Sequence, residues 1–90
     1  MFYVYVLKNI ITDKRYVGYT KSLETRFASH QSKAKRKSNK NKFSQAISTY
    51  GFSSFTLEFL FPFEEEKEAI RHERLLINFW DTKNLGYNTI

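Results

Sequence analysis

The chain has 90 residues and a formal net charge of +6, and it contains no cysteine. This length leaves room for one core, so we expect a single domain over residues 1–90; the lack of cysteine excludes disulfides and cysteine-based zinc sites. No apolar run has membrane-spanning length and the N-terminus lacks a signal-peptide layout, which predicts a cytoplasmic protein without a membrane partner. The basic charge favours a polyanion as partner, nucleic acid first, although a merely soluble basic domain is the alternative.

The N-terminal segment has the pattern of a β-hairpin. Residues 2–7 are β-branched or aromatic almost throughout, with a purely apolar face and a face that carries tyrosine hydroxyls. Residues 9–14 predict a turn, and residues 15–20 predict the returning strand. Gly18 has no side chain to pack, which indicates a bulge or a close approach of another group to the backbone.

Two helices are predicted next, separated by a basic segment. Ser22 is the expected N-cap of the first. One face of this helix combines two apolar residues with two cationic or ionisable ones: Leu23, Arg26, Phe27 and His30. Residues 33–42 are basic and polar without an apolar period, which predicts a loop. The second helix is expected from Phe43 to Tyr50, with Gly51 at the position that favours positive φ.

The last third of the chain predicts a strand and a long helix. Residues 55–61 alternate in the manner of a strand, and Pro62 is expected to end it because proline has no N–H for the ladder. Acidic residues 64–66 fill the first turn of a helix that should reach about Trp80. Residues 84–88 are expected to form a turn followed by a short extended end. The order of elements predicts an α+β fold: a small three-stranded, mainly antiparallel sheet flanked by helices, in the order β-β-α-α-β-α.

Glu73 stands out in the last predicted helix, because it shares a face with apolar residues such as Ala69 and Leu76. A carboxylate in such a place is costly unless it is paired, hydrogen-bonded or bound to a metal. The alternatives are a buried ion pair with an arginine of the first helix, and a rim position where Glu73 reaches water.

Further candidates lie in the first half of the chain. Arg26 can offer a planar fork to a phosphate, and His30 lies one turn further on the same helix face. Tyr5 and Tyr16 lie on adjacent predicted strands, where a phenol can orient a water molecule or lose its proton. The alternatives are an Arg26 paired with an acid, an exposed His30, and tyrosines that merely pack across the strands.

The basic segment is a candidate contact for nucleic acid without base specificity. No acidic residue interrupts it, and contact with a polyanion would relieve the repulsion between its like charges. The alternative is a solvated loop. Its cations are Lys33, Lys35, Arg36, Lys37, Lys40 and Lys42.

Six segments, in the same order along nearly the whole chain, resemble the GIY-YIG nuclease domain family. They are Tyr3-Val4-Tyr5 and Tyr16-Val17-Gly18 for the two motifs that name the family, residues 23–30 for its LExRxxxH helix, residues 43–51 for its AIxxYG segment, Glu73 for its metal-binding glutamate, and Gly86-Tyr87-Asn88 for the GYN ending of its homing-endonuclease branch.

The sequence departs from the family pattern in two places. Its first motif has Tyr3 in place of glycine and Val4 in place of isoleucine. Some homing members also have a histidine in the loop after the first helix, where this chain has Ser38, Asn39 and Lys40. Any role of that histidine is therefore absent here or taken by a lysine.

The resemblance implies a metal-dependent endonuclease of the homing or phage type that hydrolyses phosphodiester bonds in DNA, above all double-stranded DNA. The implied cofactor is Mg²⁺, with Mn²⁺ as a substitute, and no organic cofactor is implied. The chain is expected to act as a monomer or a transient dimer. Because no DNA-recognition region follows the nuclease segments, it is expected to be an isolated catalytic module or a standalone nuclease of little sequence specificity.

The resemblance also implies roles for single residues. Glu73 would bind the metal, and Tyr5, ahead of Tyr16, would orient or deprotonate the attacking water. Arg26 would neutralise charge in the transition state. His30 would relay a proton or bind a phosphate oxygen. Asn88 would position the metal-site network or a backbone phosphate. Gly18 would leave space in the site and take no part in the chemistry.

Two other classes of function remain open at this point. One is a non-catalytic nucleic-acid-binding module on the same fold, which would bind DNA without cutting it. The other is a basic α+β protein-interaction domain, which would show no salt-sensitive affinity for DNA.

Overall fold

The computed structural model describes residues 1–36 and 41–89. Its elements, in chain order, are β1 (Phe2–Asn9), β2 (Arg15–Thr20), α1 (Leu23–Ala34), α2 (Lys42–Tyr50), the short 3₁₀ helix η1 (Phe52–Ser54), β3 (Phe55–Phe63), α3 (Glu66–Trp80) and α4 (Thr82–Leu85). The three strands form one antiparallel sheet in the order β2-β1-β3. The predicted α+β fold and its order of elements are therefore confirmed.

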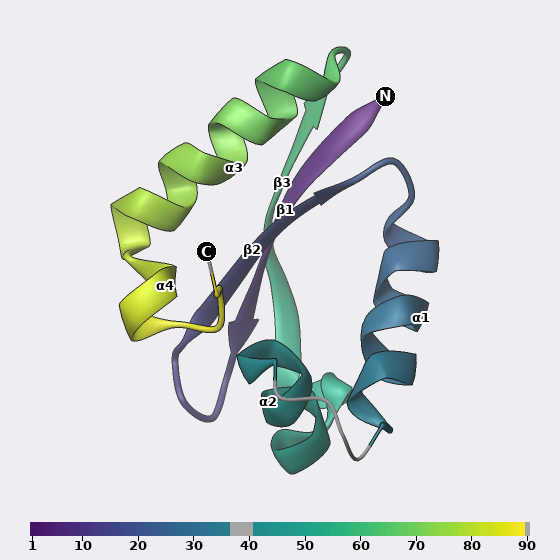
Figure 1. Ribbon diagram of the computed structural model, residues 1–90, viewed down its shortest axis with the longest axis vertical. Coiled ribbons are helices and arrows are strands. Elements are labelled where there is room, and N and C mark those ends of the chain that lie inside the picture. The colour runs from purple at the N-terminus through teal and green to yellow at the C-terminus, as the bar shows by residue number, and fades with distance from the viewer. Residues whose placement is uncertain (37–40, 90) are drawn as a thin grey trace.

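The central strand β1 supplies side chains to two cores, one on each face of the sheet. Val4 and Val6 pack in the core beneath α3, whereas Tyr5 and Leu7 pack in the core formed with α2. Figure 1 shows α3 on one side of the sheet and α1 and α2 on the other. Burial on both faces explains why β1 is built almost entirely of β-branched, aromatic and aliphatic residues.

Several element ends lie where the sequence predicts them. The Ser22 side chain caps α1 by accepting a hydrogen bond from the Thr25 amide. Gly51 ends α2 with φ 84°, a conformation that favours glycine. α3 ends at Trp80, as expected. None of the helices in the described part of the chain is long and apolar enough to span a membrane.

Two predictions about β3 are wrong. Pro62 does not end the strand, which continues to Phe63. β3 is an edge strand, so a residue without N–H is accommodated on its open side. In addition, the register between β1 and β3 shifts at Glu58. This bulge places Phe55 in the core beside α2 and Phe61 in the core beside α3, although plain alternation puts both on one face.

The C-terminal tail also differs from the prediction. A turn followed by an extended end was expected over residues 84–88, but Asn84 and Leu85 belong to the short helix α4. Asp81 adopts a left-handed conformation with φ 48° between α3 and α4. The reversal of direction at this residue brings the following tail back along β2, where Tyr87 donates its amide hydrogen to the Arg15 carbonyl at 2.9 Å.

Candidate active site

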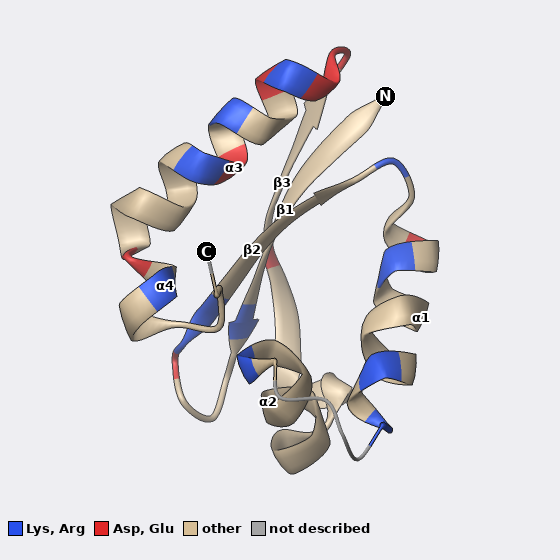
Figure 2. Ribbon diagram, viewed as in Figure 1, with Lys and Arg blue, Asp and Glu red and all other residues tan. Residues whose placement is uncertain are grey.

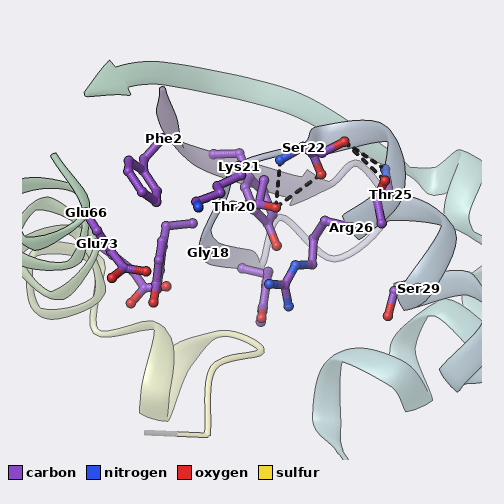
Figure 3. Close-up of a pocket in the computed structure, with 13 residues that line it drawn as sticks. Phe2, Gly18, Thr20, Lys21, Ser22, Thr25, Arg26, Ser29, Glu66 and Glu73 are labelled. Carbon is purple, nitrogen blue, oxygen red and sulfur yellow. Dashed lines mark hydrogen bonds between the residues drawn. The ribbon is translucent and has the colours of Figure 1, made fainter. Parts of the chain in front are cut away.

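A polar hollow of about 790 Å³ lies between α1 and α3 at the β2 side of the sheet, and we refer to it as the central hollow. It brings together five of the residues predicted from the sequence: Tyr5, Tyr16, Gly18, Arg26 and Glu73. Figure 3 shows Arg26 pointing into it from the α1 side and the glutamates pointing toward it from the α3 side. Residues that are far apart in the sequence therefore share one solvent-accessible space.

Tyr5 forms the buried floor of the central hollow. Its side chain is 1% exposed and its ring packs edge-on against Phe27, with centroids 5.5 Å apart. Its hydroxyl oxygen lies 2.9 Å from Nε2 of His30. The Tyr16 ring lies 6.2 Å from that of Tyr5 and stacks on Phe43 at 4.0 Å, so both phenols are held by packing.

His30 lies behind Tyr5 and is not among the residues that line the central hollow. It is 6% exposed, and burial, assisted by the positive charges of Arg26 and Lys33, lowers its pKa to about 4. The imidazole is therefore neutral near pH 7. In the tautomer with the proton on Nδ1, Nε2 accepts the hydrogen bond that the Tyr5 hydroxyl donates.

Both phenols keep their protons in the free protein. Burial raises the pKa of Tyr5 well above its usual value, and the nearby Tyr16 and Glu73 act in the same direction. Burial also raises the pKa of Tyr16, again with help from Glu73. The charge of Arg26 opposes both effects. Tyr5 and Tyr16 can therefore hold a water molecule through their hydroxyl groups without being ionised beforehand.

Glu73 supplies a half-buried carboxylate from α3. Burial raises its pKa, while Arg74, Arg26 and a hydrogen bond with the Tyr19 backbone act against that rise. Within the described residues neither Glu73 nor Arg26 takes part in a salt bridge. The buried ion pair considered from the sequence is thus not formed in this part of the chain, and the carboxylate faces the central hollow.

The donor set in the central hollow fits a hard divalent cation. Glu73 and Glu66, two helical turns apart on α3, both present carboxylate oxygens to it. Mg²⁺ prefers oxygen ligands and keeps several water molecules, so it does not need a cage of protein ligands. No group of three or more histidine, aspartate or glutamate side chains that could hold a metal occurs among the residues described.

Gly18 is placed where a side chain cannot be accommodated without movement of Tyr5. A Cβ atom built on Gly18 would lie 2.4 Å from the Tyr5 hydroxyl oxygen and 2.5 Å from the ring carbon that bears it. Gly18 and Tyr5 lie opposite each other on β2 and β1, so the phenol folds across the glycine. The close approach expected at this position is therefore present.

Asn88 lies outside the central hollow and is 5% exposed. Its side-chain oxygen accepts a hydrogen bond from the Val17 amide at 2.9 Å, and its side-chain nitrogen donates to the Val17 carbonyl at 2.8 Å. These two bonds satisfy backbone groups on the open edge of β2. The amide of Asn88 is thus bonded to the strand that carries Tyr16 and Gly18.

The four predicted DNA-contacting cations that the structure describes are not among the residues that line the central hollow. Lys33, Lys35 and Arg36 are exposed at the end of α1, and Lys42 at the start of α2 donates to the Lys83 carbonyl. The remaining two, Lys37 and Lys40, lie outside the described residues.

Sequence reasoning missed two charged residues that line the central hollow, Lys21 and Glu66. Glu66 precedes Glu73 by seven positions, so helical periodicity alone places both on one face of α3. Lys21 follows β2 directly, and its ammonium group lies 5.2 Å from the centroid of the Phe2 ring. Nothing in the local pattern distinguishes Lys21 from any other exposed lysine.

Comparisons with known proteins give a consistent result. A family model described as the GIY-YIG catalytic domain matches residues 1–88. A mutant of the catalytic domain of intron endonuclease I-TevI is 24% identical, with 100% of this chain and 95% of that chain covered and a TM-score of 0.79. A second structure, the catalytic domain of homing endonuclease I-TevI, is also 24% identical, with 97% and 96% covered and a TM-score of 0.76.

At this identity the two structures show a shared fold, and no curated protein matches the chain. The family model, by contrast, covers nearly all of the sequence, including every residue that brings chemistry to the central hollow. The chain therefore belongs to the GIY-YIG catalytic domain family.

Proposed function

We propose that this chain is a divalent-metal-dependent endonuclease that hydrolyses phosphodiester bonds in double-stranded DNA, of the homing or phage type. The observation that carries the proposal is the convergence of Arg26, the two phenols Tyr5 and Tyr16, and Glu73 on one polar hollow. These groups provide a cation for the phosphate, hydroxyls for water and a carboxylate for a metal. Membership of the GIY-YIG family supports the same activity.

Arg26 is proposed to bind the scissile phosphate. Its side chain enters the central hollow and forms no salt bridge within the described residues, so its donors are available to phosphate oxygens. A cation already in place stabilises the additional negative charge of the transition state without reorganisation. Lys21 at the rim is proposed as a second phosphate contact.

Tyr5 and His30 are proposed to take the proton of the attacking water together. With its own proton directed to Nε2 of His30, the Tyr5 oxygen can accept a proton from water while its original proton passes to the imidazole. His30 would then be cationic, which burial and Arg26 oppose in the free protein. A phosphate bound at Arg26 would offset that charge. Tyr16 is proposed to orient the same water.

Glu73 is proposed to hold the divalent metal, with Glu66 close enough along α3 to act through a bound water. When bound, the ion would supply positive charge to the scissile phosphate and to the departing oxygen. A single directly bound carboxylate predicts weak metal affinity in the absence of DNA, because phosphate oxygens would complete the coordination shell.

The remaining predicted residues are proposed to support the reaction indirectly. The basic cations, including Lys37 and Lys40 outside the described residues, would bind DNA phosphates without base specificity. Asn88 is proposed to act as a positioning residue that holds β2, since both polar atoms of its amide are bonded to Val17. Gly18 is proposed to leave the space that Tyr5 occupies.

Cleavage of supercoiled plasmid by the purified chain tests the proposal. We expect cleavage with Mg²⁺ or Mn²⁺, none with EDTA, and a loss of at least about 100-fold in Glu73→Gln, which keeps the shape of the side chain and removes its charge. Lys67→Gln, an exposed change on the same helix, is the matched control and should retain the wild-type rate.

Two results would contradict this proposal, one its activity and the other its assignment of Glu73. Metal-dependent binding of DNA without any cleavage would assign the chain to the non-catalytic binding modules. Cleavage at the wild-type rate by Glu73→Gln would remove this residue from the metal site while leaving the nuclease activity itself in place.

A further inference from the structure

The acidic residues of this protein are unevenly distributed between its two helical layers. No acidic residue occurs between Glu24 and Glu58, a stretch that contains most of α1 and all of α2. Figure 2 shows the acidic residues concentrated on α3 and the loop before it, whereas α1 beyond its first turn and α2 carry only basic ones. The α1 and α2 side of the molecule is therefore an electropositive surface.

A row of uncharged polar side chains on α2 lies within this surface, and we call it the α2 ridge. It consists of Gln45, Ser48 and Thr49, all exposed. Gln45 and Thr49 line both of two shallow hollows, one of about 390 Å³ and one of about 270 Å³, so the ridge separates them.

Cations stand on both sides of the α2 ridge. The larger hollow is also lined by Lys35 and Arg36, and the smaller one by Lys14 and Lys42. No acidic residue of the described chain lines either hollow. Amide and hydroxyl donors flanked by cations are the groups that bind the sugar–phosphate backbone of DNA, and they are unsuited to an apolar ligand.

The larger of the two hollows lies at the other end of α1 from Arg26. Arg26 lies near the start of α1 and Lys35 is the residue that caps its end, so they are nine positions apart, about 14 Å along a helix axis. A DNA strand rises by about 3.4 Å per nucleotide, so this length corresponds to roughly four nucleotides. A duplex that runs along α1 from a phosphate at Arg26 would thus bring a phosphate to the level of Lys35 and the larger hollow, beside the α2 ridge.

We propose that the α2 ridge binds the phosphate backbone of the uncut DNA that flanks the scissile bond and so holds the duplex across the central hollow. The proposal rests on the proposed nuclease function. It assigns a role to Gln45, Ser48, Thr49 and Lys14 in addition to that of the basic segment, and it requires no base-specific contact.

The test is the affinity of the full chain for a labelled 30-base-pair duplex in EDTA, measured by fluorescence anisotropy. Gln45→Glu/Ser48→Glu places two negative charges on the α2 ridge, and glutamate is compatible with a helix. Lys67→Gln/Arg71→Gln lowers the net charge by the same amount on exposed positions of α3. We expect the ridge variant to bind at least about 10-fold more weakly than the control variant, with a shallower dependence on salt.

A modified duplex makes the test independent of general electrostatics. Neutral methylphosphonates about four nucleotides from the cleavage site should weaken binding of the wild-type chain and have little effect on the ridge variant, because the contact is already lost. Circular dichroism checks that both variants fold. If the double variant is unfolded, Thr49→Glu takes its place, with Lys67→Gln alone as the control of equal charge.

Each outcome has one meaning. Equal losses for the two double variants would show that only total charge matters and would overturn the ridge, while cleavage by the wild type would leave the proposed function intact. If the ridge substitutions weakened binding to phosphatidylserine vesicles while the ridge variant bound DNA as well as the control variant does, the ridge would be assigned to anionic lipid instead of DNA. A wild-type chain that neither binds nor cuts DNA would overturn both proposals.

Discussion

Tyr5 and His30 show how burial controls the chemistry of single residues in this protein. The same burial keeps the phenol protonated and the imidazole neutral, so the pair forms a hydrogen bond between two uncharged groups. Neither group is ready to act as a base in the free protein. Bound phosphate and metal would therefore have to supply the charges that activate the pair, which would protect the site from unproductive reaction.

The low pKa of His30 predicts a specific loss of stability in acid. Above about pH 6.5 the imidazole is neutral in both the folded and the unfolded state, so it contributes nothing to the pH dependence. Between pH 6.5 and 4 the unfolded chain binds a proton that the folded chain does not, which should cost on the order of 3 kcal/mol of unfolding free energy.

Urea denaturation of the wild type and His30→Gln from pH 7.5 to 4.5 checks this prediction. The variant should start from a lower stability, because it loses the packing of the ring, but should lose less on acidification. The contributions of groups other than residue 30 cancel in the difference between the two proteins. Parallel stability curves would show that His30 titrates alike in the folded and unfolded chain.

Two glycines allow steric and conformational effects to be separated. Gly18→Ala forces a methyl group against the Tyr5 hydroxyl, so we expect a loss of about 1–3 kcal/mol in stability and of at least about 10-fold in cleavage. Gly51→Ala makes only an ordinary van der Waals contact, with the nearest atom, Ser53 Oγ, 3.7 Å away, but has an unfavourable φ of 84°. It should cost about 1 kcal/mol of stability and leave the cleavage rate unchanged. Equal rates for both variants would contradict the role given to Gly18.

At the scale of elements, β2 is the part of the fold that needs external support. It is an edge strand, yet it carries Tyr16 and Gly18, and its outer backbone is bonded by the tail that follows α4. Edge strands are commonly covered in this way to prevent pairing with other chains. Here the tail that covers β2 also holds the strand that carries Tyr16 and Gly18 into the central hollow.

Asn88→Ala should therefore destabilise the protein and impair cleavage together. The Val17 amide and the Val17 carbonyl each lose the hydrogen bond to the Asn88 side chain, which we expect to lower the free energy of unfolding by about 2–4 kcal/mol. Hydrogen exchange of the Val17 amide should become faster, and kcat should fall more than KM rises. An increase in KM with unchanged stability and exchange would instead indicate that Asn88 contacts DNA directly.

Local sequence determines most elements of this fold because their signals lie within a few residues. The Ser22 cap, the Gly51 terminus and the end of α3 at Trp80 all follow from such signals. The bulge at Glu58 does not, because it depends on the register against β1. Likewise the partner of Asn88 depends on the reversal at Asp81, where a non-glycine residue has positive φ.

The residues of the candidate site likewise include some that sequence motifs identify and one that only the tertiary structure brings into the site. Motif order places Tyr5, Tyr16, Arg26 and Glu73 in one family pattern, and the structure places them in one hollow. Lys21 belongs to that hollow because the loop after β2 carries its ammonium group over Phe2 of β1, a tertiary arrangement that no short pattern encodes.

At the scale of the whole molecule, the two cores serve different parts of the candidate site. The core beneath α3 positions Glu73, and the core formed with α2 positions Tyr5 and, through its hydrogen bond, His30. The proposed metal side and the proposed water side of the reaction are thus built on opposite faces of one sheet. They meet at its β2 side, in the central hollow.

The described chain forms one central hollow with a single set of Arg26, Tyr5 and Glu73, which predicts the order of products from plasmid DNA. One set of groups can hydrolyse one strand at a time, so nicked circles should accumulate before linear DNA appears. The rate of nicking should be proportional to protein concentration.

If the second cut requires a transient dimer, the rate of linearisation should rise with the square of the protein concentration. Independent second nicks would give a linear rise. Linear product that forms at once, with no nicked precursor, would show that two copies of the chain are already paired when they cut, and the monomeric arrangement of the site would then be incomplete.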